Sequence, residues 1–154
     1  MAKAPQRITV DTNVVLDLLL NREEFVLEAL HLFALAEEGS IELLLSTDAI
    51  STIFYVVRKN QGIATAREAI SKLLDYVTLA SLDDRSVIRG LALDFDDIED
   101  ALVAAVAEKE GAEFIVTRNI TDFKNSPVPA LSPKVYLASL MAQRKANRSS
   151  ESEM

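Results

Sequence analysis

A short run of β-branched residues, Ile8-Thr9-Val10, ends in the polar sequence Asp11-Thr12-Asn13 near the start of the chain. Short apolar runs of the same kind recur at residues 41–45, 77–80 and 114–116. Runs of this length and composition are typical of buried β-strands. The sequence therefore predicts four strands, the first of which leads directly into a carboxylate.

Longer amphipathic segments lie between these strands, with apolar residues recurring every three or four positions. They predict helices at residues 25–38, 48–59, 64–76, 84–93, 97–110 and 135–143. Strands that alternate with helices favour an α/β fold, with a parallel sheet covered by helices on both faces. Right-handed crossovers place the carboxyl ends of such strands along one edge, and functional sites form there.

Composition limits the chemistry available to the 154-residue chain. With 49% apolar residues, it is expected to form one domain over residues 1–143, followed by a polar, disordered tail at 144–154. The absence of cysteine and the single histidine, His31, exclude thiolate nucleophiles and multi-histidine metal sites. Any catalysis must therefore use carboxylates and hydroxyls.

Charge and hydropathy restrict the partners and the compartment. The chain carries 16 Lys and Arg against 24 Asp and Glu, a net charge of −8, which argues against a surface broadly covered by nucleic acid. No apolar run approaches the ~20 residues of a membrane span, and residues 1–7 lack the apolar core of a signal peptide. We therefore expect a cytoplasmic protein without a membrane segment.

Asp11 is the first candidate site residue. Because it follows the first strand, its carboxylate is expected at the carboxyl edge of the sheet. An aspartate in this position equally fits the N-cap of the next helix. The sequence leaves both interpretations open.

A dense acidic segment, Asp94-Phe95-Asp96-Asp97-Ile98-Glu99-Asp100, forms the second candidate. One or two acids at a helix start are explained by the helix dipole, but five repel one another. Asp97 and Asp100 share a face of the predicted helix, and Asp100 directly precedes its apolar stripe. Asp100 is therefore the favoured site residue of this segment.

The third candidate segment, Thr117-Arg118-Asn119-Ile120-Thr121-Asp122-Phe123, follows the last predicted strand. Asn119 and Asp122 are also ordinary turn residues. However, three acidic segments that are far apart in sequence are predicted to meet at one edge. Carboxylates without His or Cys favour hard cations such as Mg²⁺ and Mn²⁺, which can clamp the attacking and leaving oxygens of a phosphodiester.

The three segments together resemble the recurring motifs of PIN domains, over residues 7–143. The resemblance implies a three-layer α/β/α fold and Mg²⁺- or Mn²⁺-dependent cleavage of single-stranded RNA, often by the VapC-like toxin of a bacterial toxin–antitoxin pair. It also assigns roles to individual residues. Asp11, Asp100 and Asp122 become the catalytic, metal-holding acids, and Asn13, Thr117, Asn119 and Asp97 become supporting residues.

One position departs from the family pattern. The family usually has a glutamate early in the helix after the second strand, where this chain has Thr52. A hydroxyl is a weak, neutral ligand. Asp48 lies one turn earlier and either reaches the site or, as the sequence favours, caps the helix. The alternative function is therefore a catalytically weakened PIN-like module that binds RNA or protein.

Several weaker signals complete the sequence predictions. Arg118 is the best basic candidate for binding RNA near the metal, although a solvated loop arginine is an equal alternative. The apolar residues 16–20 and the first helices could form a homodimer or antitoxin face, but burial in the monomer is simpler. A phosphatase-type domain with Asp11 as nucleophile ranks low, because Asn13 stands where its second aspartate belongs.

Overall fold

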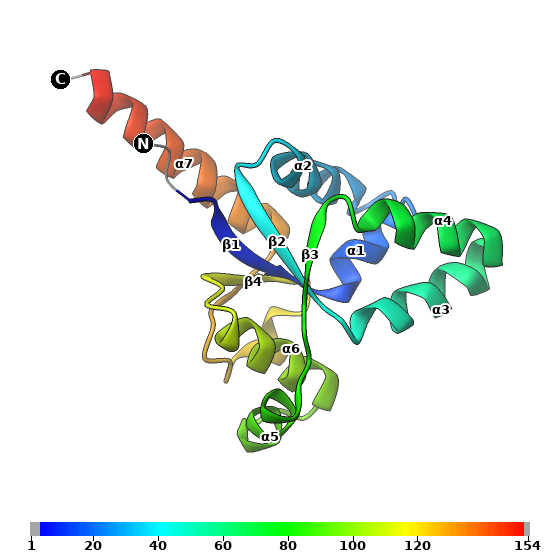
Figure 1. Ribbon diagram of the computed structural model, residues 1–154. Helices are drawn as coiled ribbons and strands as arrows, with labels where there is room; N and C mark the ends of the chain where they lie inside the picture. Colours follow the sequence, from blue (N-terminus) through cyan, green and yellow to red (C-terminus); the bar gives the residue numbers. More distant parts are fainter. Residues whose placement is uncertain (1–3, 153–154) are drawn as a thin grey trace.

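The computed structural model describes residues 4–152, and its centre is a parallel sheet (Figure 1). The strands are β1 (Gln6–Val10), β2 (Ile41–Ser46), β3 (Val77–Ala80), β4 (Phe114–Val116) and β5 (Ala130–Leu131), in the spatial order β3-β2-β1-β4-β5. The chain builds the sheet from β1 to β3 in one direction, then crosses back to place β4 on the other side of β1. Strand order therefore reverses between β1 and β4, where open α/β sheets form their binding crevices.

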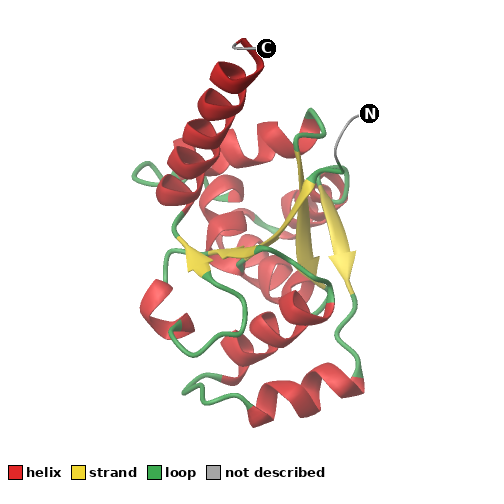
Figure 2. Ribbon diagram, turned by 90° about the vertical axis from the view of Figure 1, so that its left-hand side faces the viewer, coloured by secondary structure: helices red, strands yellow, loops and turns green. Residues whose placement is uncertain are grey.

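Helices cover both faces of the sheet, which confirms the three-layer α/β/α prediction (Figure 2). One face is covered by α1 (Thr12–Leu19), α2 (Val26–Glu37), α3 (Ala49–Gln61), α4 (Ile63–Leu73) and the first turns of α7 (Pro133–Ser152). The other face carries α6 (Ile98–Lys109), on which α5 (Asp84–Ala92) packs. A short 3₁₀ helix, η1 (Ile120–Phe123), follows β4.

Alternation along the strands divides the core into two parts. Ile8 and Val10 of β1 join the larger cluster under α1 to α4 and α7, whereas Leu44 and Ile115 face α6. The sheet-facing stripe of α6 consists largely of alanine, so this helix can lie close to the strands. The close packing of α6 brings its first turn to the carboxyl edge of the sheet.

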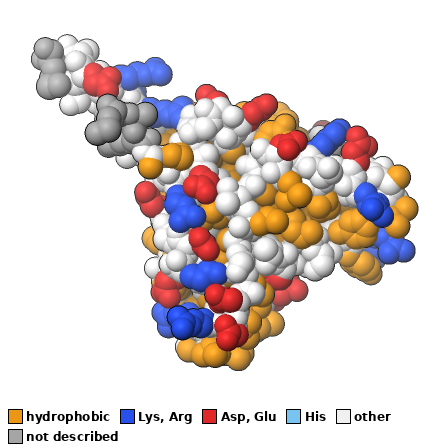
Figure 3. All heavy atoms as spheres, in the orientation of Figure 1, with side chains coloured by type: hydrophobic (Ala, Val, Ile, Leu, Met, Phe, Trp, Pro, Cys, Tyr) orange, Lys and Arg blue, Asp and Glu red, His pale blue; other side chains and the backbone are white. Residues whose placement is uncertain are grey.

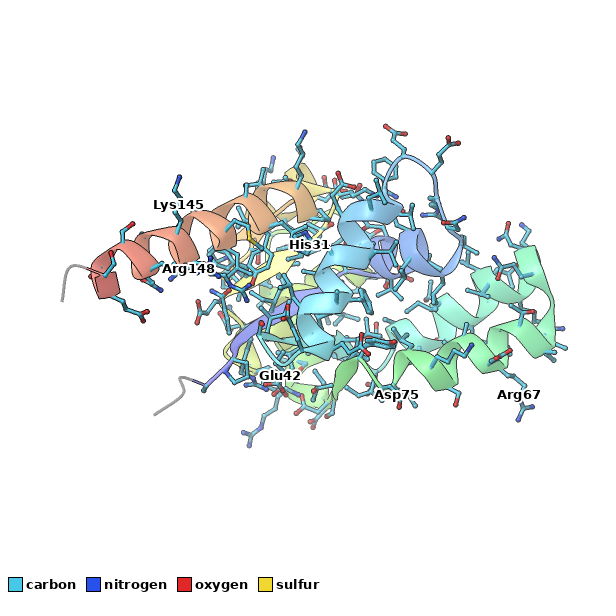
Figure 4. The ribbon with its side chains drawn as sticks, turned by 90° about the horizontal axis from the view of Figure 1, so that it is seen from above. His31, Glu42, Arg67, Asp75, Lys145 and Arg148 are labelled. Atoms are coloured by element: carbon cyan, nitrogen blue, oxygen red, sulfur yellow. The ribbon has the colours of Figure 1, made fainter. Side chains whose placement is uncertain are left out.

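Two elements differ from the sequence predictions. β5 was not predicted, and α7 is longer than the expected helix at 135–143. It continues through residues 144–152, where we expected a disordered tail, and projects beyond the body of the molecule with Lys145 and Arg148 on its surface (Figure 4). Residues 153–154 of the expected tail lie outside the described residues.

Apolar surface is unevenly distributed. Leu16 is buried and Leu18 to Leu20 pack against the core, so the monomer accounts for the apolar run at 16–20. Hydrophobic side chains are exposed at the α5 end of the molecule, where Ile88 and Leu91 are more than half exposed (Figure 3). Within residues 4–152, no helix combines the length and the apolar character that crossing a membrane requires.

Candidate active site

The candidate site lies outside the carboxyl ends of β1 and β4, where the strand order reverses. Asp11 follows β1 and Thr117 follows β4, and the backbone N–H of Asp11 donates to the carbonyl of Val116 at 3.0 Å. This bond continues the pairing of the two strands by one step. It therefore fixes the backbone at the point where both site segments leave the sheet.

Asp11 caps α1, and its carboxylate also lies at the carboxyl edge of the sheet, as the sequence predicts. Its Oδ1 accepts the N–H of Thr12 at 2.8 Å as the N-cap of α1, and its Oδ2 accepts the hydroxyl proton of Thr117 at 2.8 Å. The side chain is only 6% exposed, yet it lines the cleft described below. Burial raises the pKa of Asp11, the two hydrogen bonds oppose this effect, and the charges of Asp122 and Asp97 add to it.

Asp97 and Asp100 are positioned by the start of α6. Asp97 is the N-cap of this helix, and its Oδ1 accepts the backbone N–H groups of Glu99 at 2.7 Å and Asp100 at 3.3 Å. The pKa of Asp100 is raised to about 6. Burial is the largest cause, and repulsion from Asp11, Asp97, Asp122 and Glu99 adds to it. The carboxylates therefore interact electrostatically, although they come from three separate segments.

The loop after β4 supplies the remaining polar groups. Thr117 is fully buried, and its Oγ1 accepts the N–H of Asn119 at 3.0 Å while donating to Asp11. The amide of Asn13 makes longer contacts, at 3.5 Å to Asp11 Oδ2 and 3.4 Å to Thr117 Oγ1. Asp122 lies on η1, where its backbone N–H donates to the carbonyl of Asn119.

These groups border one cleft of about 420 Å³, which we call the acidic cleft. Eight of the predicted site residues line it, and the buried Thr117 donates to Asp11, which is one of the eight. The eight are Asp11, Asn13, Asp48, Thr52, Asp97, Asp100, Asn119 and Asp122. The structure thus brings together nearly all of the candidate residues.

Asp48 does not cap α3, contrary to the interpretation that the sequence favoured. It occupies the N-cap position, but its side chain makes no capping hydrogen bond, and Ser46 Oγ donates to its Oδ1 instead. The extended backbone that capping usually requires is absent, because Asp48 already has helical dihedral angles of φ −66° and ψ −25°. Its carboxylate is therefore left to line the acidic cleft beside Thr52.

Arg118 is the predicted residue that the structure separates from the cleft. Its Nε and one terminal nitrogen donate to the two oxygens of Asp17 at 2.7 and 3.1 Å, and its guanidinium lies 3.9 Å from the centre of the Phe25 ring. The Asp17 side chain is 1% exposed, and a buried carboxylate needs such a counter-charge. This pairing directs the guanidinium toward Asp17 and Phe25, and Arg118 is not part of the cleft lining.

Asp17 and Arg22 are the residues that sequence reasoning missed. Arg22 also donates to Asp17, at 3.2 Å, and it lines the acidic cleft. We call Asp17, Arg22, Phe25 and Arg118 the Asp17 cluster. The available signal was an acid in the middle of the apolar run of residues 14–20, since a charge there requires a buried partner.

The donor set of the acidic cleft fits a hard divalent cation. Carboxylate and amide oxygens suit Mg²⁺ and Mn²⁺. Burial first, and repulsion among the acids second, raise the pKa of Asp100, and a bound dication opposes both effects. Within residues 4–152, no three acidic side chains already stand together as a closed metal-holding group. The cleft therefore offers suitable ligands without a preformed coordination shell.

Comparisons with known proteins point to one family. The ribonuclease VapC1 of Aquifex aeolicus (strain VF5) is 24% identical over 136 residues, which are 85% of this chain and 93% of that protein. A chain of the DNA-bound VapBC from Salmonella typhimurium superposes with a TM-score of 0.67 at 15% identity, covering 83% of this chain and 98% of that one. A chain of a toxin–antitoxin complex from Klebsiella pneumoniae gives a TM-score of 0.61 at 23% identity, covering 82% and 97%.

The two structural relatives share the fold of this chain. The family model of the PIN domain matches residues 7–121, a span that includes Asp11, Thr52 and Asp100 and ends just before Asp122. The matched span contains all but the first residue of β1, the whole of β2 to β4, and the switch point between β1 and β4. The chain therefore belongs to the PIN domain family.

Proposed function

We propose that this protein is a divalent-metal-dependent endoribonuclease that cleaves single-stranded RNA and acts as the toxin of a toxin–antitoxin pair. The observation that carries the proposal is the meeting of Asp11, Asp100 and Asp122, from three distant segments, in one cleft. Their mutual repulsion would be costly in a site without a cationic ligand. A cluster maintained at this cost favours a role in binding metal and phosphate.

The comparisons support the reaction class. The relative that spans 85% of this chain is named a ribonuclease, and two structural relatives are VapBC or toxin–antitoxin complexes. Mg²⁺ or Mn²⁺ would be held by Asp11, Asp100 and Asp122. When bound, such an ion supplies positive charge and Lewis acidity to the phosphodiester.

The residues of the chain have separable tasks in this proposal. Thr117 donates to Asp11 Oδ2 and receives the Asn119 N–H, so it fixes the Asp11 carboxylate and the loop after β4 together. Asp97 holds the backbone of Asp100 through its capping bonds. Burial and the neighbouring acids raise the pKa of Asp100 to about 6, so its carboxyl carries a proton at mildly acidic pH until a cation displaces it.

The weakened-module alternative rests on Thr52, and the position of Asp48 weighs against it. Thr52 lines the acidic cleft and contributes no charge, but Asp48 lines the same cleft from the preceding turn. We therefore propose that Asp48 supplies the acid that the family usually places at the position of Thr52. The cleft then keeps a carboxylate from the start of α3.

Cleavage of a mixed single-stranded RNA pool in Mn²⁺ or Mg²⁺ tests the proposal. Wild type should cut, Asp100→Asn should lose about a hundredfold or more, and Asp48→Asn should lose about tenfold. Asp75→Asn is the matched control, because this exposed residue precedes β3 at the opposite edge of the sheet (Figure 4). If wild type is inert while Thr52→Glu cuts, the weakened binding module is the correct function.

We further propose an antitoxin protein as partner and the cytoplasm as the place of action. The support is the pair of complexes among the structural relatives, together with exposed apolar residues such as Leu27 on α2. We also propose that the chain alone forms a homodimer. Light scattering should then give twice the 16.9 kDa mass of the chain, and the monomer mass would contradict this.

A further inference from the structure

Arg22 differs from every other charged residue of the acidic cleft. Six acids line the cleft, namely Asp11, Asp48, Asp97, Glu99, Asp100 and Asp122, and Arg22 is the one cation among the described residues of its lining. An RNA phosphate that approaches these acids needs positive charge from the protein as well as from a metal. Arg22 is therefore placed where a phosphate contact is needed.

The end of α1 fixes the backbone of Arg22. Asn21 adopts the left-handed conformation, with φ 51°, which asparagine tolerates better than most residues. The N–H of Asn21 donates to Leu18 and the N–H of Arg22 donates to Asp17, the pair of bonds that defines a Schellman motif. The root of the Arg22 side chain is therefore rigid, and its long stem decides what the guanidinium reaches.

Two arginines share the Asp17 carboxylate unequally. Arg118 donates through two nitrogens, at 2.7 and 3.1 Å, and also stacks on Phe25. Arg22 donates through one terminal nitrogen at 3.2 Å, and its side chain is 36% exposed against 26% for Arg118. An arginine has five N–H donors. Arg22 uses one of them here and keeps the rest for another acceptor.

This inequality determines which arginine can leave Asp17. If Arg22 turns to a phosphate, Asp17 keeps a bidentate counter-charge from Arg118, so the buried carboxylate stays neutralised. If Arg118 turned away, Asp17 would keep one weaker bond and the contact with Phe25 would be lost. Thr52 also leaves its position in the cleft uncharged, so it does not compete with phosphate for Arg22.

We infer that Arg22 is the phosphate-binding residue of the cleft. Arg118 is the positioning residue that keeps the negative charge of Asp17 compensated when Arg22 moves. This inference rests on the proposed function, since it takes single-stranded RNA as the ligand. It assigns the RNA contact to a residue outside the three family motifs. The competing role for Arg22 is a permanent structural ion pair with Asp17.

Equilibrium binding and cleavage distinguish these roles. A labelled mixed-sequence single-stranded RNA is titrated with protein in Ca²⁺ at several salt concentrations, and gel electrophoresis checks that the RNA stays intact. Arg22→Ala should weaken binding roughly tenfold or more and reduce the salt slope by about 0.7, the value of one phosphate contact. The RNA affinity of Arg22→Lys should fall between those of wild type and Arg22→Ala, because lysine keeps the positive charge but lacks the planar guanidinium that binds phosphate through two nitrogens.

Arg67→Ala is the matched control. It removes the same charge from an exposed site on α4 outside the cleft lining, and binding should stay within about twofold of wild type (Figure 4). In single-turnover cleavage, Arg22→Ala should raise the half-saturating protein concentration more than it lowers the maximal rate. Its melting temperature should stay close to that of wild type, because Arg118 still pairs with Asp17.

Each result bears on the inference. If wild type cuts RNA and Arg22→Ala binds and cuts like Arg67→Ala, Arg22 is a structural residue and the proposed function stands without it. If wild type neither binds nor cuts RNA, the proposed function fails and this inference fails with it. If Arg22→Ala does not fold, Arg22→Lys is used in its place. The inference is overturned if the folded Arg22→Lys variant has the RNA affinity and salt slope of wild type but a lower melting temperature.

Discussion

Two buried aspartates, Asp11 at the N-cap of α1 and Asp17 within α1, have opposite surroundings. Asp17 is 1% exposed and receives three hydrogen bonds from the guanidinium groups of Arg22 and Arg118. Asp11 is 6% exposed, and its close donors are the neutral groups of Thr12 and Thr117. The charged side chains that shift its pKa are further acids, Asp122 and Asp97.

The difference is the one expected between a structural charge and a charge that serves to bind a ligand. A buried charge that the fold fully compensates contributes to the architecture, and breaking its pair is costly. A buried charge surrounded by like charges is compensated only when a ligand arrives, which is characteristic of a binding site. Asp11 and Asp17 lie at the start and within the same short helix, so the packing of this helix alone does not produce the difference.

The largest expected effect is that of Asp11→Asn on catalysis. Removal of this carboxylate should lower single-turnover cleavage by about a thousandfold, because metal-ion catalysis is worth several kcal/mol. The stability of the metal-free protein should not fall, since burial already disfavours the charge of Asp11. Urea unfolding in chelator measures stability. Activity within tenfold of wild type would show that Asp11 is only a helix cap.

Arg118→Met should affect stability in place of catalysis. It leaves Asp17 buried with Arg22 alone, and we expect a loss of about 2–3 kcal/mol in the free energy of unfolding, measured by urea denaturation. Adding Asp17→Asn should recover part of this loss in a double-mutant cycle. RNA affinity per folded molecule should also fall, because Arg22 is then the remaining counter-charge of Asp17 and is held there, whereas the maximal cleavage rate should stay near that of wild type. Asp17→Asn in the same variant should restore the affinity, and a loss of affinity that Asp17→Asn does not restore would instead show that Arg118 contacts RNA itself.

The sequence predicts the acidic cleft better than the Asp17 cluster. Asp11, Asp100 and Asp122 could be found because each follows a predicted strand or starts a predicted helix, and the topology of a parallel sheet brings such positions together. Asp17 and Arg118 are 101 residues apart, and their contact depends on how α1 packs against the loop after β4. No local pattern indicates that packing.

The other differences have local physical reasons. β5 has two residues, which is too short for an alternating or apolar pattern to stand out. Residues 144–152 carry no apolar stripe, but a projecting helix does not need one, and Arg, Lys, Ala and Glu favour helices intrinsically. Aspartate is a preferred N-cap residue, which is why the sequence favours capping by Asp48. The hydroxyl of Ser46, two residues earlier, donates to the Asp48 carboxylate instead.

The pH dependence of stability gives a smaller test of the same comparison. In chelator, folded Asp100 binds its proton with a pKa of about 6, against an ordinary value of 3.8, so the folded protein loses stability as pH rises through this range. Asp100→Asn removes the effect. It should raise the melting temperature by about 2–4 °C above pH 6, equivalent to about 1 kcal/mol once solvent screening is allowed for, and by progressively less toward pH 4.

The matched control for this series is again Asp75→Asn, which removes an exposed carboxylate outside the cleft. Its melting temperature should follow wild type at every pH. Mn²⁺ should then stabilise wild type and leave Asp100→Asn nearly unchanged, because only the intact acid set gains a ligand. Equal stabilisation of both proteins by Mn²⁺ would remove Asp100 from the set of metal-holding acids.

Thr9→Val is the substitution with the smallest expected effect. Thr9 lies on β1 two residues before Asp11, it is 1% exposed, and its hydroxyl has no hydrogen-bond partner within the described structure. Thr9→Val should raise the free energy of unfolding by about 0.5–1 kcal/mol, because it removes an unsatisfied polar group with little change in shape. Cleavage should stay unchanged, because Thr9 lines neither the cleft nor the Asp17 cluster. If Thr9→Val lowered activity at unchanged stability, the unpaired hydroxyl of Thr9 would have a functional role although it carries no charge. Charge compensation alone would then not explain the difference between Asp11 and Asp17.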